Sequence, residues 1–253
     1  SLPTVEVLLP CLRGDLHALA EQPLAAHQRH QPPAVASVLA AMSNRTCAAQ
    51  GVAGSDGRFL VTCAVRLSAE KNPLLFVEVM EAIGHHLEAK GLLPLLCGAT
   101  ADASLAREIK ERLRAAVPSA VVLDDFLGPE ALGSVLSATR LNFHPCLYDA
   151  YGMSVVEAAA FGAPSVVNGG GSVGATALLN PDGVGTAEQG CFELDLRSSS
   201  IAELGHAVLA ALDDEPRLQS VAQTAKERAL GWSEAAAGRA IYDRLQQLRS
   251  QHA

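Results

Sequence analysis

Short apolar segments alternate with longer amphipathic segments over most of the chain, from about residue 58 onward. The apolar segments predict buried strands at 59–65, 93–97, 120–123, 141–144, 165–167 and 190–194. The segments between and after them predict helices at 73–90, 103–116, 129–138, 152–162, 173–179, 199–212, 215–229 and 233–249. Strands that alternate with helices form a parallel sheet with helices on both faces. With right-handed crossovers, the pattern predicts an α/β fold, a Rossmann-like three-layer domain.

The first 57 residues carry a weaker pattern. Val5 to Pro10 predicts one strand, Arg13 to Ala20 predicts a short helix, and Val35 to Met42 has some helical potential. The chain of 253 residues is long enough for one large domain or two small ones. Hydrophobic residues make up 49% of it, so a substantial core is expected.

Charge and cysteine content narrow the class of protein. The formal net charge of −8 argues against a nucleic-acid partner, which requires a basic face. No apolar run reaches the ~18 residues of a membrane-spanning helix, and the N-terminus lacks the regions of a signal peptide. None of the six cysteines has the C-x-x-C spacing of a metal or redox site, so a reducing compartment is the simpler interpretation. We therefore expect a cytoplasmic protein without a transmembrane segment.

The stretch HPCLYDAYGMSVVEAAAFGAP (144–164) contains the most informative motif. It places Asp149 eight residues before Glu157, with a Tyr-Gly turn between them and then a helix. A helix that begins at Gly152 or Met153 presents backbone N–H groups and the positive end of its dipole, which suit a phosphate. Carboxylates accept hydrogen bonds from hydroxyls, so the motif is the outline of a nucleotide-sugar site. The plain alternative is a helix N-cap at Asp149 and a solvated helix residue at Glu157.

This segment resembles the signature of family-4 glycosyltransferases, which are retaining enzymes of the type-B fold. That signature has an acidic residue, a Gly-containing turn, a helix with Glu at the eighth position, and an Ala-rich end with Gly and Pro. Asp149 stands where the family more usually has Glu. The resemblance implies that Asp149 binds sugar hydroxyls, that Glu157 binds ribose hydroxyls, and that N–H groups at Gly152, Met153 and Ser154 bind phosphate. It also implies direct front-face substitution without a protein nucleophile, a metal or another cofactor.

A second match lies in FLVTCAVRLSAEKNP (59–73), where an apolar strand precedes Arg66 and Lys71. Two cations at the carboxyl end of a parallel strand suit an anionic ligand, because open α/β sheets bind ligands at that edge. Arg binds phosphate bidentately, and Lys acts as a point charge. The resemblance assigns donor pyrophosphate binding to Arg66 and Lys71, although the family usually has Gly where this chain has Val65. A surface salt bridge is the plain alternative for either cation alone.

Two further features belong to the same edge of the predicted sheet. The glycines at 169–171 follow a strand, and such a run forms either an anion site or simply a turn. Relatives carry a Gly-rich loop near the donor here, which implies that Gly169 and Gly170 contact the substrate. Asp124-Asp125 lacks the D-x-D spacing of a metal pair, and we expect no metal site.

The resemblance covers roughly residues 59–245, the C-terminal donor-binding half of a type-B fold. A complete enzyme also has an N-terminal domain, so we expect that missing domain as a partner. An apolar stripe at Ile241, Leu245 and Leu248 favours self-association or ordinary core packing. The implied divisions are an interdomain connection with a variable insertion at 1–57, the Rossmann-like donor-binding domain at 58–230, and a C-terminal crossing helix at 231–253.

The leading prediction is the donor-binding domain of a retaining, hexosyltransferase-type glycosyltransferase. It moves a sugar from a nucleotide diphosphate sugar to an acceptor hydroxyl, while Arg66 and Lys71 neutralise the leaving diphosphate. The alternative is a non-catalytic nucleotide-binding or interaction module of the same fold. A sugar-nucleotide epimerase of that fold fits the acidic motif less well. The resemblance leaves open whether the isolated chain is active.

Overall fold

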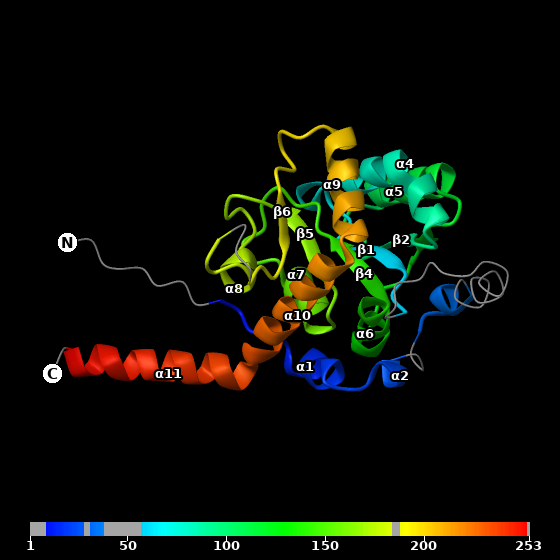
Figure 1. Cartoon of the computed structure of the whole chain (residues 1–253). Coiled ribbons are helices and arrows are strands. Elements are labelled where there is room, and N and C mark those ends of the chain that lie inside the picture. The colour runs from blue at the N-terminus through cyan, green and yellow to red at the C-terminus, as the bar shows by residue number, and fades with distance from the viewer. Residues whose placement is uncertain (1–8, 28–30, 38–56, 184–187, 252–253) are drawn as a thin grey trace.

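The computed structural model describes residues 9–27, 31–37, 57–183 and 188–251. They form three layers with a parallel sheet at the centre (Figure 1). The strands are β1 (Leu60–Ala64), β2 (Leu93–Cys97), β3 (Val121–Val122), β4 (Thr139–Phe143), β5 (Ser165–Asn168) and β6 (Phe192–Leu194). Their order is β3-β2-β1-β4-β5-β6, and every neighbouring pair is parallel. This doubly wound order confirms the predicted Rossmann-like α/β class.

The strand order reverses between β1 and β4. β1 leads to β2 and β3 on one side, whereas β4 leads to β5 and β6 on the other. The crossovers bring the carboxyl ends of all these strands to one edge of the sheet. In open α/β sheets, ligands bind at that edge where the order reverses. The carboxyl ends of β1 and β4 therefore frame the expected position of a binding site.

Helices cover both faces of the sheet (Figure 1). Apolar side chains of α4, α5 and α9 pack on one face. Those of α6 and α7 pack on the other face, where α1 lies against both helices. α10 packs against α7, α8 and α9. The helices are α1 (Gly14–Ala20), α2 (Leu24–His27), η2 (Ala69–Lys71), α4 (Pro73–Ala89), α5 (Ala103–Ala116), α6 (Pro129–Ser137), α7 (Met153–Ala160), α8 (Thr176–Leu179), α9 (Ile201–Asp213), α10 (Glu215–Gly231) and α11 (Glu234–Gln251).

The central strand β1 is buried on both faces, as its continuous apolar sequence predicts. Leu60 and Val61 have no solvent exposure. The polar residue among them, Thr62, has its Oγ1 2.7 Å from Oγ1 of Thr139. The Thr139 hydroxyl in turn donates to the carbonyl of Val135 at 2.8 Å. Both buried hydroxyls therefore have partners, and a threonine is tolerated inside the sheet.

From residue 58 onward, the predicted elements agree with the structure to within a few residues at most boundaries. The largest boundary difference is at α8, which begins at Thr176 instead of Val173, and β3 keeps only two of its four predicted residues. Val173 instead forms an isolated parallel bridge with Asp149, so the helix starts later. The loop after β5 is thereby tied to the loop after β4.

The N-terminal predictions are tested only in part. α1 confirms the short helix predicted at 13–20, and residues 33–37 are helical. Most of the strand predicted at 5–10, and the rest of the segment 35–42, lie outside the described residues. The same holds for most of the predicted insertion.

α11 extends away from the sheet and its flanking helices (Figure 1). The turn before it is attached to the N-terminal segment, because Trp232 Nε1 donates to the carbonyl of Leu9 at 3.2 Å. The side chains of the predicted stripe, Ile241, Leu245 and Leu248, are exposed to solvent. Core packing of this stripe is therefore not found among the described residues. None of the described helices combines the length and the apolar character that crossing a bilayer requires.

Candidate functional site

A pocket, which we call the switch-point pocket, opens where the strand order reverses between β1 and β4. It contains both predicted cations and both predicted carboxylates, although these residues are far apart in the chain. The loop after β1, the loop after β4 and the first turns of α7 supply its walls. The lining residues are Ala64, Val65, Arg66, Lys71, His144, Asp149, Ala150, Tyr151, Gly152, Met153, Ser154 and Glu157.

The loop after β1 positions Lys71. The chain forms the short 3-10 turn η2, and Asn72 then adopts a left-handed conformation with φ 50° that directs the chain into α4. Asn72 Nδ2 lies 3.4 Å from the carbonyl oxygen of Pro145, to which it donates. Lys71 Nζ lies 2.6 Å from Asp149 Oδ2. An ion pair in the pocket therefore joins the loop after β1 to the loop after β4.

Asp149 has different partners on its two carboxylate oxygens. Oδ1 accepts a hydrogen bond from the N–H of Gly152 at 3.0 Å, which fixes the turn before α7. The N-cap of α7 is Gly152, so Asp149 is not the helix N-cap of the plain alternative. Oδ2 faces Lys71 and also His144, whose Nε2 is 3.2 Å away. Burial acts to raise the pKa of Asp149, but the contacts with His144 and Lys71 outweigh it and hold the pKa well below its usual range. Asp149 is therefore an ionised, positioned acceptor in the pocket.

His144 is a pocket residue that the sequence analysis did not single out. It directly follows β4 and is almost wholly buried. Its Nδ1 lies 3.4 Å from Ser154 Oγ, whereas Nε2 forms no hydrogen bond. The contact of Nε2 with the Asp149 carboxylate is thus close in distance but lacks the direction of a hydrogen bond. The available signal was a polar side chain at the carboxyl end of an apolar strand.

Arg66 lies at the exposed side of the switch-point pocket. Its Nη2 donates to Glu70 Oε1 at 2.6 Å, so the surface salt bridge considered for this residue is present. Each pocket cation is thus paired with a carboxylate, Arg66 with Glu70 and Lys71 with Asp149. An anion that enters the pocket has to compete with these two carboxylates.

Glu157 lies in the second turn of α7 and is half-buried, so it is not the fully solvated helix residue of the plain alternative. Burial raises the pKa of Glu157, and the positive charge of Arg13 partly opposes this. Arg13 is itself held by Asp15, through hydrogen bonds of 3.1 and 2.6 Å. The Glu157 carboxylate therefore occupies a partly desolvated place where a hydroxyl donor would relieve the cost of burial.

The start of α7 depends on a glycine. Gly152 has φ 84°, and a Cβ there would lie 2.9 Å from Val173 Cγ1. The N–H of Gly152 already donates to Asp149. The next N–H groups, of Met153 and Ser154, belong to the first helical turn and have no acceptor within the helix. These two, rather than three, N–H groups are the candidates for phosphate binding.

The glycine loop after β5 runs beside the pocket but does not line it. The N–H of Gly169 donates to the carbonyl of Leu194 at 2.8 Å, which ties the loop to β6. Gly170 has φ 73°, and a Cβ there would meet nothing within 4 Å. The loop is linked to the pocket through Ser172, whose carbonyl accepts from the N–H of Asp149 at 2.9 Å, and through Gly174, whose N–H donates to the carbonyl of Asp149 at 3.0 Å. Gly169 and Gly170 therefore lie outside the pocket wall, and the loop supports Asp149 from behind.

A second pocket, which we call the side pocket, adjoins the first. Arg66, Ser154 and Glu157 line both pockets. The ring of Phe126 stands at the rim of the side pocket and is 78% exposed. Ala64 and Val65 also line both pockets. The residues that line the side pocket alone are, apart from Phe126, mostly apolar: Arg13, Cys97, Gly98, Ala99, Leu127, Pro129 and Leu132.

Close approach of two backbones shapes the floor of the side pocket. Gly98 has φ 149°, and a Cβ there would lie only 1.7 Å from the carbonyl oxygen of Val65. The N–H of Val65 donates to the carbonyl of Cys97 at 3.1 Å. Val65 stands where the resembled family usually has glycine. In this protein, the close approach of the two backbone segments is allowed by Gly98, which follows the neighbouring strand β2.

Comparison with known proteins agrees with this architecture. A family profile described as "Glycosyl transferases group 1" matches residues 50–228. Among curated proteins, none matches this sequence. Three similar solved structures are an α,α-trehalose-phosphate synthase (UDP-forming) from Burkholderia vietnamiensis (13% identity, TM-score 0.69), Anabaena Alr3699/HepE in complex with UDP and glucose (16%, 0.60), and the C-terminal domain of the group 1 glycosyltransferase LpcC from Francisella tularensis (13%, 0.56).

The alignments cover different shares of this chain and of the similar proteins. The alignments cover 96%, 87% and 68% of this chain, respectively. The chain spans about half the length of the first two proteins, 52% and 55%, and 84% of the LpcC C-terminal domain. At these identities the solved structures show a shared fold, that of a type-B glycosyltransferase domain. Since the family profile matches well over half of the sequence, the chain belongs to the group 1 glycosyltransferases.

Proposed function

We propose that this chain is the donor-binding domain of a retaining glycosyltransferase and binds a nucleoside diphosphate sugar across the switch-point and side pockets. The observation that carries this proposal is the meeting of Arg66, Lys71, Asp149 and Glu157 in one pocket where the strand order reverses. Cations suit the diphosphate, and carboxylates suit the hydroxyls of ribose and sugar. A nucleotide sugar carries both a diphosphate and hydroxyl groups, so its site needs cations and carboxylates close together.

The diphosphate binds between the loop after β1 and the start of α7. Arg66 and Lys71 supply positive charge, and the N–H groups of Met153 and Ser154 supply donors at the positive end of the helix dipole. The phosphates displace Glu70 from Arg66 and share Lys71 with Asp149. Because both cations are already paired, binding exchanges one set of ionic contacts for another, and its affinity depends on ionic strength.

The nucleoside occupies the side pocket. Glu157 lines both pockets, so its carboxylate lies where ribose joins base and diphosphate, and it accepts hydrogen bonds from the ribose hydroxyls. The exposed ring of Phe126 stacks on the base. UDP is the first nucleotide to test, because the descriptions of two matched structures name it.

The sugar lies next to Asp149. Its hydroxyls donate to Oδ2, which is held in place by Lys71 and His144. In the reaction, the bond between the anomeric carbon and the diphosphate oxygen breaks, and the acceptor oxygen bonds to the same face of that carbon. The acceptor's proton passes to the departing phosphate. Arg66 and Lys71 stabilise the charge that grows on the leaving oxygen, so we propose that transfer needs no metal ion.

The whole enzyme extends beyond this domain in our proposal. An N-terminal domain provides the acceptor site for hexosyl transfer and contacts the exposed apolar face of α11. The competing outcome is self-association of this domain through the same face. Light scattering distinguishes the two outcomes by the molar mass in solution.

The five described cysteines are all free thiols, and four of them are buried. They support our further proposal of a reducing, cytoplasmic setting.

Calorimetric titration with UDP, GDP and ADP tests the proposed function. We expect at least one nucleotide to bind with one-to-one stoichiometry, and the double variant Arg66→Ala, Lys71→Ala to lose that binding. The matched control is Lys90→Ala, Arg112→Ala, which removes the same charge from ion pairs with Asp213 and Glu81 outside both pockets. Absence of binding in the wild-type domain, or equal loss in the control, contradicts the proposal.

The second candidate is a nucleotide-binding module without catalysis. Asp149 in place of the Glu usual in the resembled family favours it. A turnover assay on a protein that contains both domains separates the two candidates. Loss of sugar transfer in Glu157→Ala excludes the binding-only function, whereas nucleotide binding without any turnover in the wild type favours it.

A further inference from the structure

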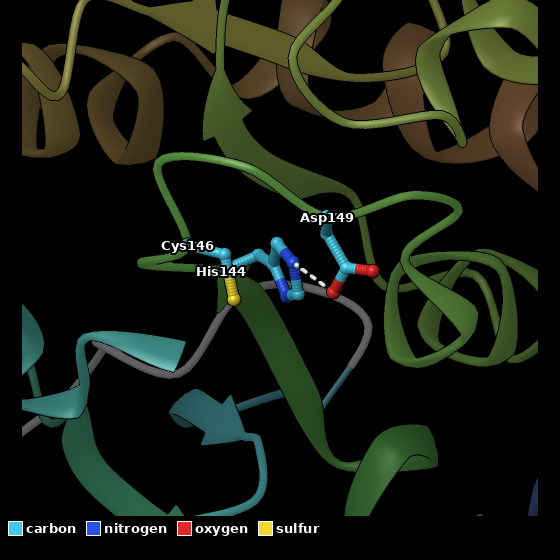
Figure 2. Close-up of side chains that lie close together, drawn as sticks. All are labelled: His144, Cys146 and Asp149. Carbon is cyan, nitrogen blue, oxygen red and sulfur yellow. Dashed lines mark ion pairs between the residues drawn. The ribbon is translucent and has the colours of Figure 1, made fainter. Parts of the chain in front are cut away.

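Three side chains of metal-binding types lie together in the loop after β4 (Figure 2). His144, Cys146 and Asp149 offer one nitrogen, one sulfur and one oxygen atom, all within 4.8 Å of one another. His144 Nε2 and Asp149 Oδ2 are already 3.2 Å apart. Thiolate, imidazole and carboxylate together are ligands that Zn²⁺ accepts in tetrahedral sites.

The imidazole ring of His144 has the orientation and contacts that are typical of a metal-binding histidine. The side chain is 2% exposed, and its Nδ1 lies 3.4 Å from Ser154 Oγ, which fixes the orientation of the ring. Nε2 is buried, has no hydrogen bond and faces Asp149. Metal-binding histidines commonly use one nitrogen for an outer partner and the other for the metal. In place of a hydrogen bond, Nε2 has only the poorly directed contact with the Asp149 carboxylate at 3.2 Å, so a cation bound by both groups would give each of them a partner.

The position of the three side chains also allows a cation to enter the site and to complete its coordination. His144 and Asp149 line the switch-point pocket, so a cation reaches them from solvent through it. Cys146 is fully buried behind them, with Sγ 3.5 Å from the carbonyl oxygen of Lys71. Three protein ligands leave a fourth position, which a water molecule in the pocket fills.

We propose that His144, Cys146 and Asp149 bind a divalent transition-metal cation, with Zn²⁺ as the expected ion, and that this cation opposes donor binding. Binding forms bonds from the metal to nitrogen, sulfur and oxygen and releases the Cys146 thiol proton to solvent. The metal takes the carboxylate oxygen that now contacts Lys71. That oxygen holds the sugar in our proposed function, so only the inhibitory consequence rests on that function.

Cobalt titration of the metal-free domain tests the site without any nucleotide. We expect one equivalent of Co²⁺ to produce visible bands of tetrahedral cobalt and a thiolate-to-cobalt charge-transfer band, both reversed by Zn²⁺. Cys146→Ser should abolish the charge-transfer band and weaken binding by at least about tenfold. Cys191→Ser, another buried cysteine, and His85→Gln, His86→Gln, a neighbouring histidine pair, are the controls.

The variant Lys71→Met supplies a second test of metal binding. Its expected effect on cobalt affinity does not follow if His144, Cys146 and Asp149 have only a structural role. Lys71 Nζ competes with the metal for Asp149 Oδ2, so its removal should strengthen cobalt binding several-fold while it weakens binding of nucleoside diphosphates. If Cys146→Ser does not fold, His144→Gln supplies the ligand deletion. A missing charge-transfer band in the wild type, equal loss in Cys191→Ser, or loss only in the His85, His86 variant overturns the metal site.

The inhibitory consequence has its own test. Zn²⁺ should weaken the binding of a nucleoside diphosphate sugar to the wild-type domain, and this weakening should exceed that in Cys146→Ser by at least about tenfold. The comparison with Cys146→Ser corrects for zinc that the nucleotide itself binds. Equal weakening in both proteins overturns the proposed inhibition. If the domain binds no nucleotide at all, the cobalt titration still decides the metal site, so the two proposals fail separately.

Discussion

The ion pair between Lys71 and Asp149 should contribute measurably to stability as well as to the site. The charged atoms are 2.6 Å apart, and the side chains are 23% and 14% exposed. At an effective dielectric constant of ~20, Coulomb attraction at that distance is about 6 kcal/mol before desolvation is subtracted. Loss of one partner leaves the other charge partly buried, and we expect Lys71→Met to cost about 3 kcal/mol of unfolding free energy.

A double-mutant cycle isolates the interaction. Lys71→Met, Asp149→Asn and the double variant are compared with the wild type by urea unfolding, followed by circular dichroism and the fluorescence of the single tryptophan, Trp232. Asparagine keeps an oxygen that accepts from the N–H of Gly152, so the turn before α7 should survive. We expect a coupling energy of about 1–3 kcal/mol. A coupling below about 0.5 kcal/mol refutes the reasoning, because the pair would then behave like an exposed one.

Three other variants test separate features. Gly98→Ala should lower the free energy of unfolding by about 3 kcal/mol and abolish nucleotide binding, because its Cβ meets the Val65 carbonyl; an unchanged urea midpoint contradicts this. Glu157→Gln should raise stability near pH 7 by about 0.5–2 kcal/mol. Burial raises the folded pKa of Glu157, so its cost to stability grows as the pH rises from the unfolded pKa of about 4.3 and is complete above the folded pKa. The gain in Glu157→Gln should therefore vanish below pH ~4.3, and a gain that persists there refutes the assignment. Phe126→Ala should leave the urea midpoint unchanged but weaken nucleotide binding by about 1–3 kcal/mol in calorimetry, with inorganic pyrophosphate as the control ligand.

The charged residues of the site could be predicted from the sequence because they lie at the ends of strands and helices with a clear hydrophobic pattern. Arg66 and Lys71 follow an apolar strand, and the Gly152 turn separates Asp149 from its helix. Doubly wound topology then brings these positions to one edge, whatever their separation in the chain. The sequence therefore predicted both the fold and the four charged residues of the pocket.

The side chains that contact these charged residues could not be predicted in the same way. His144 contacts Asp149 across a loop, and Glu70 pairs with Arg66 on the rim. Neither contact follows from periodicity, because both depend on loop conformation. The glycine loop is a different case: the family resemblance implies substrate contact for Gly169 and Gly170, but neither residue lines the switch-point pocket.

The most direct test of the donor-site assignment is a crystal structure of the domain with a bound nucleoside diphosphate. We predict the base in the side pocket beside Phe126, the ribose at Glu157, and the phosphates between Lys71 and the N–H groups of Met153 and Ser154. Asp149 should remain free of phosphate and face the empty sugar position. A nucleotide bound away from the carboxyl ends of β1 and β4, or one bound with its phosphates distant from α7, contradicts the account.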